Sequence, residues 1–404
     1  MHSITGYLIR YNRLARNISQ ESLCRGICVV SYLSKIEQGK VVPSEEIIEQ
    51  LFEALQLTYV YDYSFIRKYK KMMIQAIEKT LFEESNAKEA QQISEHKQEL
   101  ECSPLCIDVR LFELFQNIEV DETYNLDDVK TKIEKMRVFE TYMDEEQSFL
   151  YHYLYSFVED FDQQIFHLKK AASYHLCSMQ VLRLGELYHN HGYFAKAIEC
   201  YQQGSVLANE EGLCINSCTA SFMLGNCYSG LREKSLMLKY YRRAANIART
   251  LCDNEILSYI YYNIGSSYLE WNLIEECEEP LLRALAYQPK EPLLFYQKLA
   301  LYYIETKEQS EVTKYIALCD KELQYNKNPL FMKMNEFVHL RSKKAYLKNP
   351  RYLKVLEDIC AIHEDKITFG FRVFHIHYLI AAYQANRRYK EAFMLKETLD
   401  SIIS

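Results

Sequence analysis

Glycine and proline are scarce in this 404-residue chain, which contains 11 and 7 of them, respectively. Both residues interrupt helices, and together they make up about 12% of an average protein. So few breakers predict successive helices joined by short connections. Because 49% of the residues are hydrophobic and 25% are charged, the composition also excludes global disorder. We therefore predict an all-α fold, with more than one structural unit at this length.

Long apolar runs are also missing. No segment reaches the roughly 18 consecutive apolar residues of a membrane-spanning helix, and the opening MHSITGYLIRYNRLARN contains no signal-peptide core. The 13 cysteines are spread along the chain without a compact framework, which is typical of free thiols in a reducing compartment. We expect a cytoplasmic protein with no membrane partner.

Sequence signatures of catalysis and of metal binding are absent as well. The chain has no phosphate-binding glycine loop and no His-Glu metalloprotease motif. Three cysteine pairs lie four residues apart, which favours helix packing over a structural zinc site. We predict no catalytic residue, no cofactor and no metal, and hence a protein that is not an enzyme.

Positive charge is concentrated at the N-terminus. Residues 1–40 contain six basic and two acidic residues, a net charge of +4, whereas the whole chain carries −7. The remaining residues therefore sum to −11. A basic segment joined to an acidic body indicates a small nucleic-acid contact at one end of the molecule.

Four short helices are predicted in the first sixty residues. In the first, the spacing predicts that Ile4, Leu8, Tyr11, Leu14 and Ala15 share the buried face. A serine at position 19 can cap the second helix, and the third would span residues 30–38 and end at a glycine. The segment PSEEIIEQLFEALQL supplies the fourth. Together these helices would form one small domain.

The segment LARNISQESLCRGICVVSYLSKIEQGKVVPSEEIIEQLFEAL resembles the Xre-type helix-turn-helix of phage repressors. Within it, GICVVSYLSKIEQGK…PS is particularly similar to the N-terminal domain of the Rgg, PlcR and NprR regulators. By this resemblance, residues 30–38 are the recognition helix that enters the major groove, and Arg13 and Glu37 match a structural ion pair. The implied base contacts are Val30, Ser31 and Lys35, and the implied DNA-backbone contacts are Gln20, Tyr32 and Lys40. The alternative is a four-helix docking domain that touches no DNA.

Internal repeats follow the first hundred residues. Leu184-Gly185 recurs as Leu224-Gly225, Ile264-Gly265 and Leu299-Ala300, with periods of 40, 40 and 35 residues. A tyrosine lies three residues after each small residue, and a bulky side chain lies sixteen after it. This is the tetratricopeptide (TPR) pattern of paired helices. We predict a helix-turn-helix domain in residues 1–66, a helical connector in 67–104, and in 105–404 a right-handed TPR superhelix for peptide binding and dimerisation.

The concave wall of such a superhelix is lined by the first helix of each pair. Counted from the small residue, positions −3, −2, +1 and +5 face inward. These positions are Leu182, Arg183, Glu186 and Asn190; Phe222, Met223, Asn226 and Gly230; Tyr262, Asn263, Ser266 and Glu270; and Gln297, Lys298, Leu301 and Glu305. Asparagine is informative here because its carboxamide can pair with a peptide backbone of any sequence.

The motifs LGNCY and YYNIGSSY resemble the inner helices of the Rap–Rgg–NprR–PlcR–PrgX (RRNPP) receptors, where asparagines hold an extended signalling peptide. By this resemblance, the basic candidates would take a peptide carboxylate and the aromatic ones its apolar side chains. The alternative is that each asparagine only bridges within its own helix. The peptide-binding candidates are Arg183, Glu186, Phe222, Asn226, Tyr259, Tyr262, Asn263, Gln297 and Lys298.

The combined pattern resembles a quorum-sensing transcription regulator. Its partners would be an operator in double-stranded DNA, a short signalling peptide and a second copy of the chain. Two alternatives stay open: a TPR scaffold or anti-regulator that acts through a protein partner, as in phages or mobile elements, and a Rap-like phosphatase.

Overall fold

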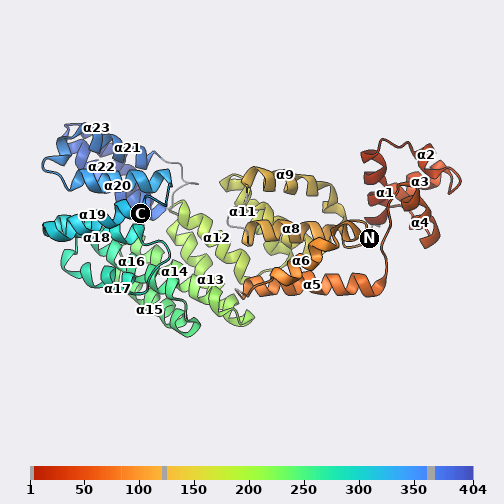
Figure 1. Cartoon of the computed structure of the whole chain (residues 1–404), viewed down its shortest axis with the longest axis horizontal. Coiled ribbons are helices and arrows are strands. Elements are labelled where there is room, and N and C mark those ends of the chain that lie inside the picture. Colours follow the sequence, from red (N-terminus) through yellow and green to blue (C-terminus); the bar gives the residue numbers. More distant parts are fainter. Residues whose placement is uncertain (1–3, 83, 121–124, 362–368, 404) are drawn as a thin grey trace. The chain divides into compact units, whose positions relative to one another are not determined.

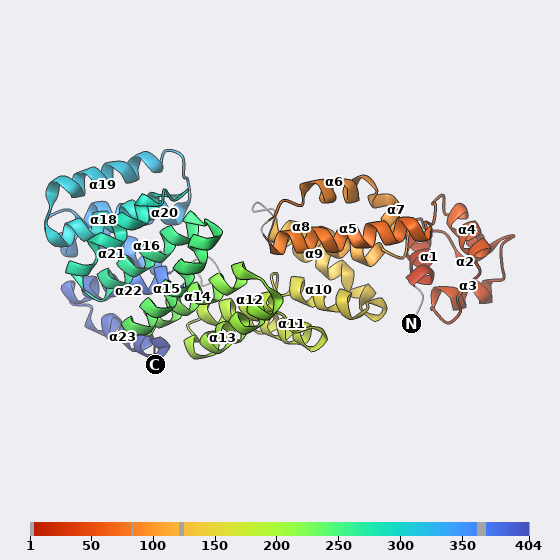
Figure 2. The same ribbon diagram turned by 90° about the horizontal axis from the view of Figure 1, so that it is seen from below.

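The computed structural model describes residues 4–82, 84–120, 125–361 and 369–403, and Figures 1 and 2 show it in two views. Every regular element among these residues is a helix, which confirms the all-α prediction. The chain divides into two compact units, residues 1–176 and 177–404.

The first unit starts with four short helices and continues with longer ones. The predicted boundary at 66/67 falls inside the fifth helix, and the one at 104/105 lies just before the eighth; the three-domain division stays a prediction. The elements are α1 (Ile4–Ala15), α2 (Gln20–Cys24), α3 (Val30–Glu37), α4 (Glu45–Ala54), α5 (Tyr63–Leu81), α6 (Ala87–Glu95), α7 (Lys97–Glu101), α8 (Cys106–Glu119), α9 (Leu126–Met136), the 3-10 helix η1 (Arg137–Tyr142), α10 (Glu145–Tyr155) and α11 (Phe161–Tyr174).

The first four helices lie where the sequence predicts them, and α3 ends one residue before the predicted limit of 38. The Ser19 hydroxyl caps α2 by accepting a hydrogen bond from the Ser22 amide at 3.0 Å. Gly39, with φ of +66°, follows the end of α3. Helix α1 approaches α3 so closely that a Cβ on Gly6 would lie 1.9 Å from the Ile36 carbonyl oxygen. The position therefore requires glycine.

The predicted buried face of α1 is wrong in part. Leu8 is buried as expected, but Tyr11 is 45% exposed and Leu14 is 54% exposed. The core-facing side instead includes Gly6 and Arg13, because close approach to α3 and an ion pair fix the helix there. The spacing of apolar residues in the sequence predicts neither the close helix contact nor the ion pair.

Helix α1 also contacts later helices of the first unit. The Tyr7 ring lies 4.7 Å from that of Phe139 and 5.4 Å from that of Tyr142, centroid to centroid. The Arg110 guanidinium lies over the rings of Tyr11 and Phe139, at 5.6 and 5.0 Å. These contacts join α1 to η1 and α8.

The second unit consists of antiparallel helix pairs. Consecutive helices pack as α12 with α13, α14 with α15, α16 with α17, and α18 with α19, and the last four helices form two further pairs. The elements are α12 (Ser178–Asn190), α13 (Phe194–Glu211), α14 (Cys214–Gly230), α15 (Lys234–Leu251), α16 (Asn254–Glu270), η2 (Ile274–Glu276), α17 (Glu278–Ala286), α18 (Leu293–Thr306), α19 (Gln309–Glu322), α20 (Pro329–Arg341), η3 (Tyr346–Lys348), α21 (Pro350–Cys360), α22 (Phe369–Ala385) and α23 (Tyr389–Ile403).

Small residues lie where the paired helices touch, as the repeat predicts. A Cβ on Gly225 would lie 2.4 Å from the Tyr241 ring, and one on Gly265 would lie 2.5 Å from Leu281. The fourth repeat departs from this pattern, because Ile316, sixteen residues after Ala300, is only half-buried. There Tyr315 is buried instead and stacks on Tyr303, with 5.5 Å between ring centroids.

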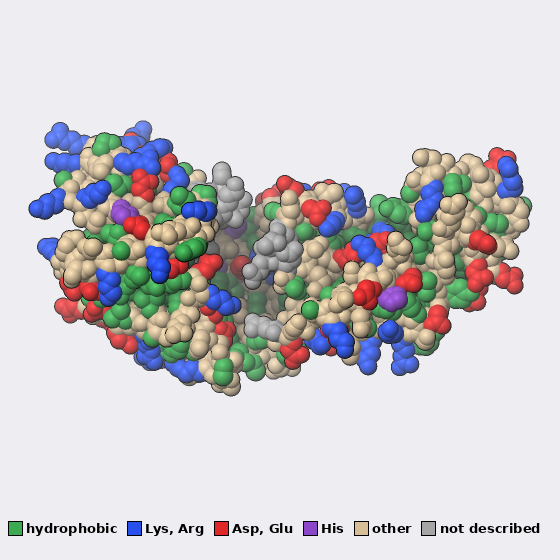
Figure 3. All heavy atoms as spheres, viewed as in Figure 1, with side chains coloured by type: hydrophobic (Ala, Val, Ile, Leu, Met, Phe, Trp, Pro, Cys, Tyr) green, Lys and Arg blue, Asp and Glu red, His purple; other side chains and the backbone are tan. Residues whose placement is uncertain are grey.

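The surface charge is uneven. Asp and Glu side chains gather over α4, whereas Lys and Arg side chains gather over α21 to α23 (Figure 3). The net negative charge of residues 41–404 is therefore not spread evenly over the surface. In the part of the chain that the structure describes, no helix combines the length and the apolar character needed to cross a bilayer.

Candidate functional site

The outward face of α3 is the first candidate site. Val30 is 41% exposed, and Ser31 and Lys35 are exposed beside it. Lys40 is exposed just after the helix, and Tyr32 is half-buried. The opposite face of α3 packs into the core through Leu33, Ile36 and Glu37. Three of the predicted DNA contacts, Ser31, Lys35 and Lys40, are thus exposed side chains outside the core.

A buried ion pair holds this helix in place. Arg13 Nε donates to Glu37 Oε1 at 2.6 Å, and Arg13 Nη2 donates to Glu37 Oε2 at 2.8 Å. Arg13 also donates to the Ile18 carbonyl oxygen at 2.9 Å. The hydrogen bonds to Glu37 raise the pKa of Arg13, against the opposing effect of burial. A two-pronged pair of this kind fixes orientation as well as distance.

Gln20 belongs to the same network. Its Nε2 donates to Glu37 Oε2 at 2.7 Å, so the side chain of α2 is bound to α3. An amide nitrogen carries two hydrogens, and this bond uses one of them. The predicted phosphate contact at Gln20 is compatible with the network and stays a prediction.

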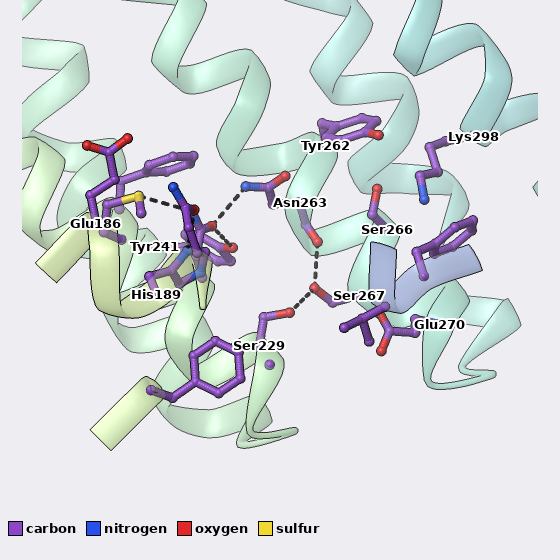
Figure 4. A pocket seen from close by; sticks show the side chains of 18 residues that line it. Glu186, His189, Ser229, Tyr241, Tyr262, Asn263, Ser266, Ser267, Glu270 and Lys298 are labelled. Carbon is purple, nitrogen blue, oxygen red and sulfur yellow. Dashed lines mark hydrogen bonds between the residues drawn. The ribbon is translucent and has the colours of Figure 1, made fainter. Parts of the chain in front are cut away.

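The second candidate site is a cavity of about 380 Å³ in the second unit (Figure 4). It lies between the first helices of successive pairs, and α22 contributes to it from far along the chain. The lining residues are Glu186, His189 and Asn190 on α12; Phe194 on α13; Phe222, Met223, Asn226, Ser229 and Gly230 on α14; Tyr241 on α15; Tyr262, Asn263, Ser266, Ser267 and Glu270 on α16; Lys298 on α18; and Val373 and Phe374 on α22.

Two asparagines join α14 and α16 across the cavity wall. Asn263 Nδ2 donates to Asn226 Oδ1 at 2.9 Å, and the Tyr241 hydroxyl donates to the same oxygen at 2.6 Å. Asn226 Nδ2 donates to the sulfur of Met223 at 3.3 Å, a weak acceptor. Asn263 therefore bridges α16 to α14, while Asn226 bonds both across to α16 and within its own helix. A stronger acceptor on a ligand would compete well for Asn226 Nδ2.

Two serines continue the polar wall. The hydroxyls of Ser229 and Ser267 are 2.6 Å apart, and Ser267 donates to the Asn263 carbonyl oxygen at 2.7 Å (Figure 4). Ser229 therefore donates to Ser267. Hydrogen bonds therefore connect α14 and α16 along the wall that carries the asparagines.

The charged groups of the cavity are unevenly paired. Glu186 forms an ion pair with Arg183 at 2.7 Å, and Glu270 Oε1 lies 3.6 Å from Nε2 of His377. Lys298 is only 4% exposed, and its nitrogen lies 2.8 Å from the centroid of the Phe374 ring. Burial lowers the pKa of Lys298 well below its ordinary value, and nearby Glu270 opposes this shift.

Most of the predicted peptide-binding residues line this cavity. Arg183 lies outside it, paired with Glu186. Tyr259 also lies outside, with its ring 5.7 Å from that of Phe295. Gln297 is buried and donates to the Phe331 carbonyl oxygen at 3.2 Å. The predicted residues that do line the cavity are Glu186, Phe222, Asn226, Tyr262, Asn263 and Lys298.

Sequence reasoning missed several lining residues. His189 and Ser229 both lie four positions after the small residue of their repeat, so adding position +4 to the inward set would have found them. Phe374 had no signal, since it reaches Lys298 from 76 positions further along the chain. Among the described residues, no group of three or more His, Cys, Asp or Glu side chains is placed to hold a metal ion.

Comparison with known proteins identifies both parts of the chain. The helix-turn-helix family matches residues 9–61, and the tetratricopeptide repeat family matches residues 181–205 and 258–291. The transcriptional activator NprA of Geobacillus stearothermophilus is 22% identical over 324 residues, which cover 75% of this chain and 73% of NprA.

Solved structures share the fold. A Rap protein complexed with Competence and Sporulation Factor superposes with a TM-score of 0.63 at 14% identity, covering 83% of this chain and 98% of Rap. The apo quorum sensor NprR of B. thuringiensis has a TM-score of 0.60 at 12% identity, covering 84% and 99%. NprR in complex with its cognate peptide NprX has a TM-score of 0.55 at 17% identity, covering 82% and 98%.

The chain is thus a helix-turn-helix protein with a TPR body, similar to known transcription regulators. Its fold is shared with the solved Rap and NprR structures.

Proposed function

We propose that this chain is a cytoplasmic transcription regulator that binds operator DNA as a homodimer and is switched by a short signalling peptide. The observation that carries the proposal is the cavity of the TPR unit, in which Asn226 and Asn263 share one wall. NprA is a transcriptional activator and NprR has been solved with a cognate peptide, which supports the same division of roles.

DNA binding falls to the outward face of α3. Lys35 would donate to guanine, Ser31 would pair with either base type, and Val30 would pack on a thymine methyl group. Gln20, Tyr32 and Lys40 would contact the DNA backbone. In a symmetric dimer, two such helices would meet half-sites about 34 Å apart or a multiple of that distance.

Peptide binding falls to the TPR cavity. A volume of about 380 Å³ admits a few side chains of a peptide rather than all of it, so the remainder would lie along the wall. Asn226 and Asn263 would pair with the peptide backbone, while Phe222 and Tyr262 would contact apolar side chains. Since Asn226 now bonds to Asn263, a peptide must replace or share that bond.

The energy available is sufficient for a switch. To move the protein from mostly one state to mostly the other, the peptide must prefer one state by roughly 5 kcal/mol. Binding in the micromolar to nanomolar range releases about 8 to 12 kcal/mol. A peptide of ordinary affinity can therefore control DNA binding.

The test uses the full chain. A duplex selected from a random library would be labelled, and its affinity measured by fluorescence anisotropy with and without five- to ten-residue peptides encoded beside the gene. We expect one peptide to change the affinity at least tenfold and to release heat in calorimetry. Failure to select any duplex would overturn the DNA-binding role, and thermal silence with every peptide would favour the scaffold alternative.

A further inference from the structure

A second cavity, of about 420 Å³, lies within the first unit, between η1, α10 and α11. Figure 2 shows α10 and α11 side by side. Nine of the ten residues that line this cavity have a polar side-chain atom, and Phe166 is the exception. None of the ten belongs to the proposed DNA or peptide sites.

Two buried histidines face each other in the cavity wall. Nδ1 of His152 lies 2.8 Å from Nδ1 of His167, and the two residues are 3% and 9% exposed. At this distance one ring donates a hydrogen and the other accepts it, so the accepting ring is neutral. Burial lowers the pKa of both residues, so this histidine pair is uncharged at pH 7. The contact uses Nδ1 of each ring and leaves Nε2 of each for another partner.

The histidine pair can take up one proton and keep its contact. A proton added to Nε2 of the donating ring makes that ring an imidazolium, and the hydrogen bond between the Nδ1 atoms stays in place. Both Nε2 atoms then carry a hydrogen. A second proton would need Nδ1 of the accepting ring and would break the contact. The pair can therefore add one positive charge to the cavity wall.

The fixed charges of the cavity favour an anion. Glu159, between α10 and α11, forms an ion pair with Lys130 of α9 at 3.4 Å. The other charged residues of the lining are Arg137 and Glu140 on η1 and Lys170 on α11, and none of them forms an ion pair with a described residue. Two cations therefore face one carboxylate. Positive charge is in excess even while the histidine pair is neutral.

We propose that this cavity binds a small organic anion, a carboxylate or a phosphate monoester, through Arg137, Lys170 and the histidine pair. The guanidinium and the ammonium supply charge-assisted hydrogen bonds. Phe166 lines the same cavity and is 53% exposed, so a planar apolar ring on the ligand has a surface to pack against. A volume of about 420 Å³ suits a small molecule.

Proton uptake should accompany binding of the anion. The free histidine pair is neutral, and a negative charge beside it would raise its pKa, so the complex holds a proton that the free protein lacks. Affinity should therefore fall as pH rises through the pKa of the complex. The other titratable groups around the pair are Arg137 and Glu140 on η1, Tyr151 and Tyr155 on α10, Glu159 with its partner Lys130, and Lys170 and Tyr174 on α11.

Four probes with one phenyl ring each would be titrated into the full chain by calorimetry: benzoate, phenyl phosphate, benzamide and benzylamine. We expect at least one of the two acidic probes to bind tenfold or more tightly than the neutral benzamide, and the cationic benzylamine to bind no more tightly than benzamide. The two acidic probes distinguish a carboxylate site from a phosphate site. Affinity for the tighter acidic probe should fall at least threefold from pH 6.5 to pH 8.5.

Lys170→Met should reduce the preference for the acidic probe at least fivefold, because it removes one of the two cations without an ion pair. Lys169→Met is the matched control, since Lys169 is the exposed neighbour on α11 and does not line the cavity. His167→Gln should abolish the pH dependence while keeping the preference that the two cations supply. Circular dichroism would check that each variant is folded.

Equal binding of acidic and neutral probes, tightest binding of benzylamine, or no binding of any probe would refute the anion site. A preference that survives Lys170→Met unchanged would do the same. These outcomes involve neither a peptide nor DNA, so they are distinct from failure of the proposed function.

Discussion

At the scale of single residues, Glu37 holds the first three helices together. Its carboxylate accepts hydrogen bonds from both Arg13 and Gln20, and so links the first three helices. Glu37→Ala would leave the Arg13 charge buried without its partner, at a cost of roughly 3–5 kcal/mol. Hydrogen exchange of amides in residues 4–60 of the full chain should then speed up. Glu21→Ala, at an exposed position of α2, is the control and should exchange like the parent protein.

Lys35 offers the opposite case, a residue with no packing role. We expect Lys35→Ala to weaken binding of a selected duplex by about 1–3 kcal/mol, as loss of a base contact does, and to leave peptide binding unchanged. Anisotropy and calorimetry measure the two effects separately. Lys71→Ala, an exposed lysine of α5, is the control. If Lys35→Ala and the control lower DNA affinity equally, the effect is one of net charge only.

At the scale of helices, Gly225 shows what the repeat demands. Because a Cβ there would meet the Tyr241 ring at 2.4 Å, Gly225→Ala should force α14 and α15 apart and cost about 1–3 kcal/mol in urea unfolding. It should also weaken peptide binding, since Tyr241 donates to Asn226. Gly212→Ala strains a left-handed residue at φ +74° but meets no atom within 4 Å. It should lower stability while leaving the cavity intact.

Sequence alone predicts helices well where the signal is local. The start of α2 at Ser19 and the glycine after the end of α3, Gly39, follow from capping chemistry that acts over a few residues. The inward positions of the first three repeats follow from helical period, and most of them line the cavity. The buried face of α1 was predicted wrongly because Arg13 is buried through its ion pair with Glu37, which lies 24 residues further along the chain. Phe374 was missed for the same reason, since only the folded chain brings α22 to α18.

At the scale of the whole molecule, DNA binding and peptide response should be separable. Asn263→Ala removes a hydrogen-bond donor from the cavity wall of the second unit, and the predicted DNA contacts belong to the first unit. We expect it to abolish the effect of peptide on duplex affinity while leaving peptide-free affinity within twofold. Asn246→Ala, at an exposed position of α15, should behave like the parent protein. Loss of peptide-free DNA binding in Asn263→Ala alone would contradict the division of roles.

Helix α1 packs against two different neighbours, and this restricts which of its residues can be substituted. One side of α1 is pressed against Ile36 through Gly6, and another carries Tyr7 among the rings of Phe139 and Tyr142. Few substitutions in α1 can satisfy both neighbours. If the proposed DNA contacts hold, substitutions at Ser31 and its outward neighbours would change operator preference without disturbing packing, whereas a substitution at Gly6 or Tyr7 would disturb a contact of α1.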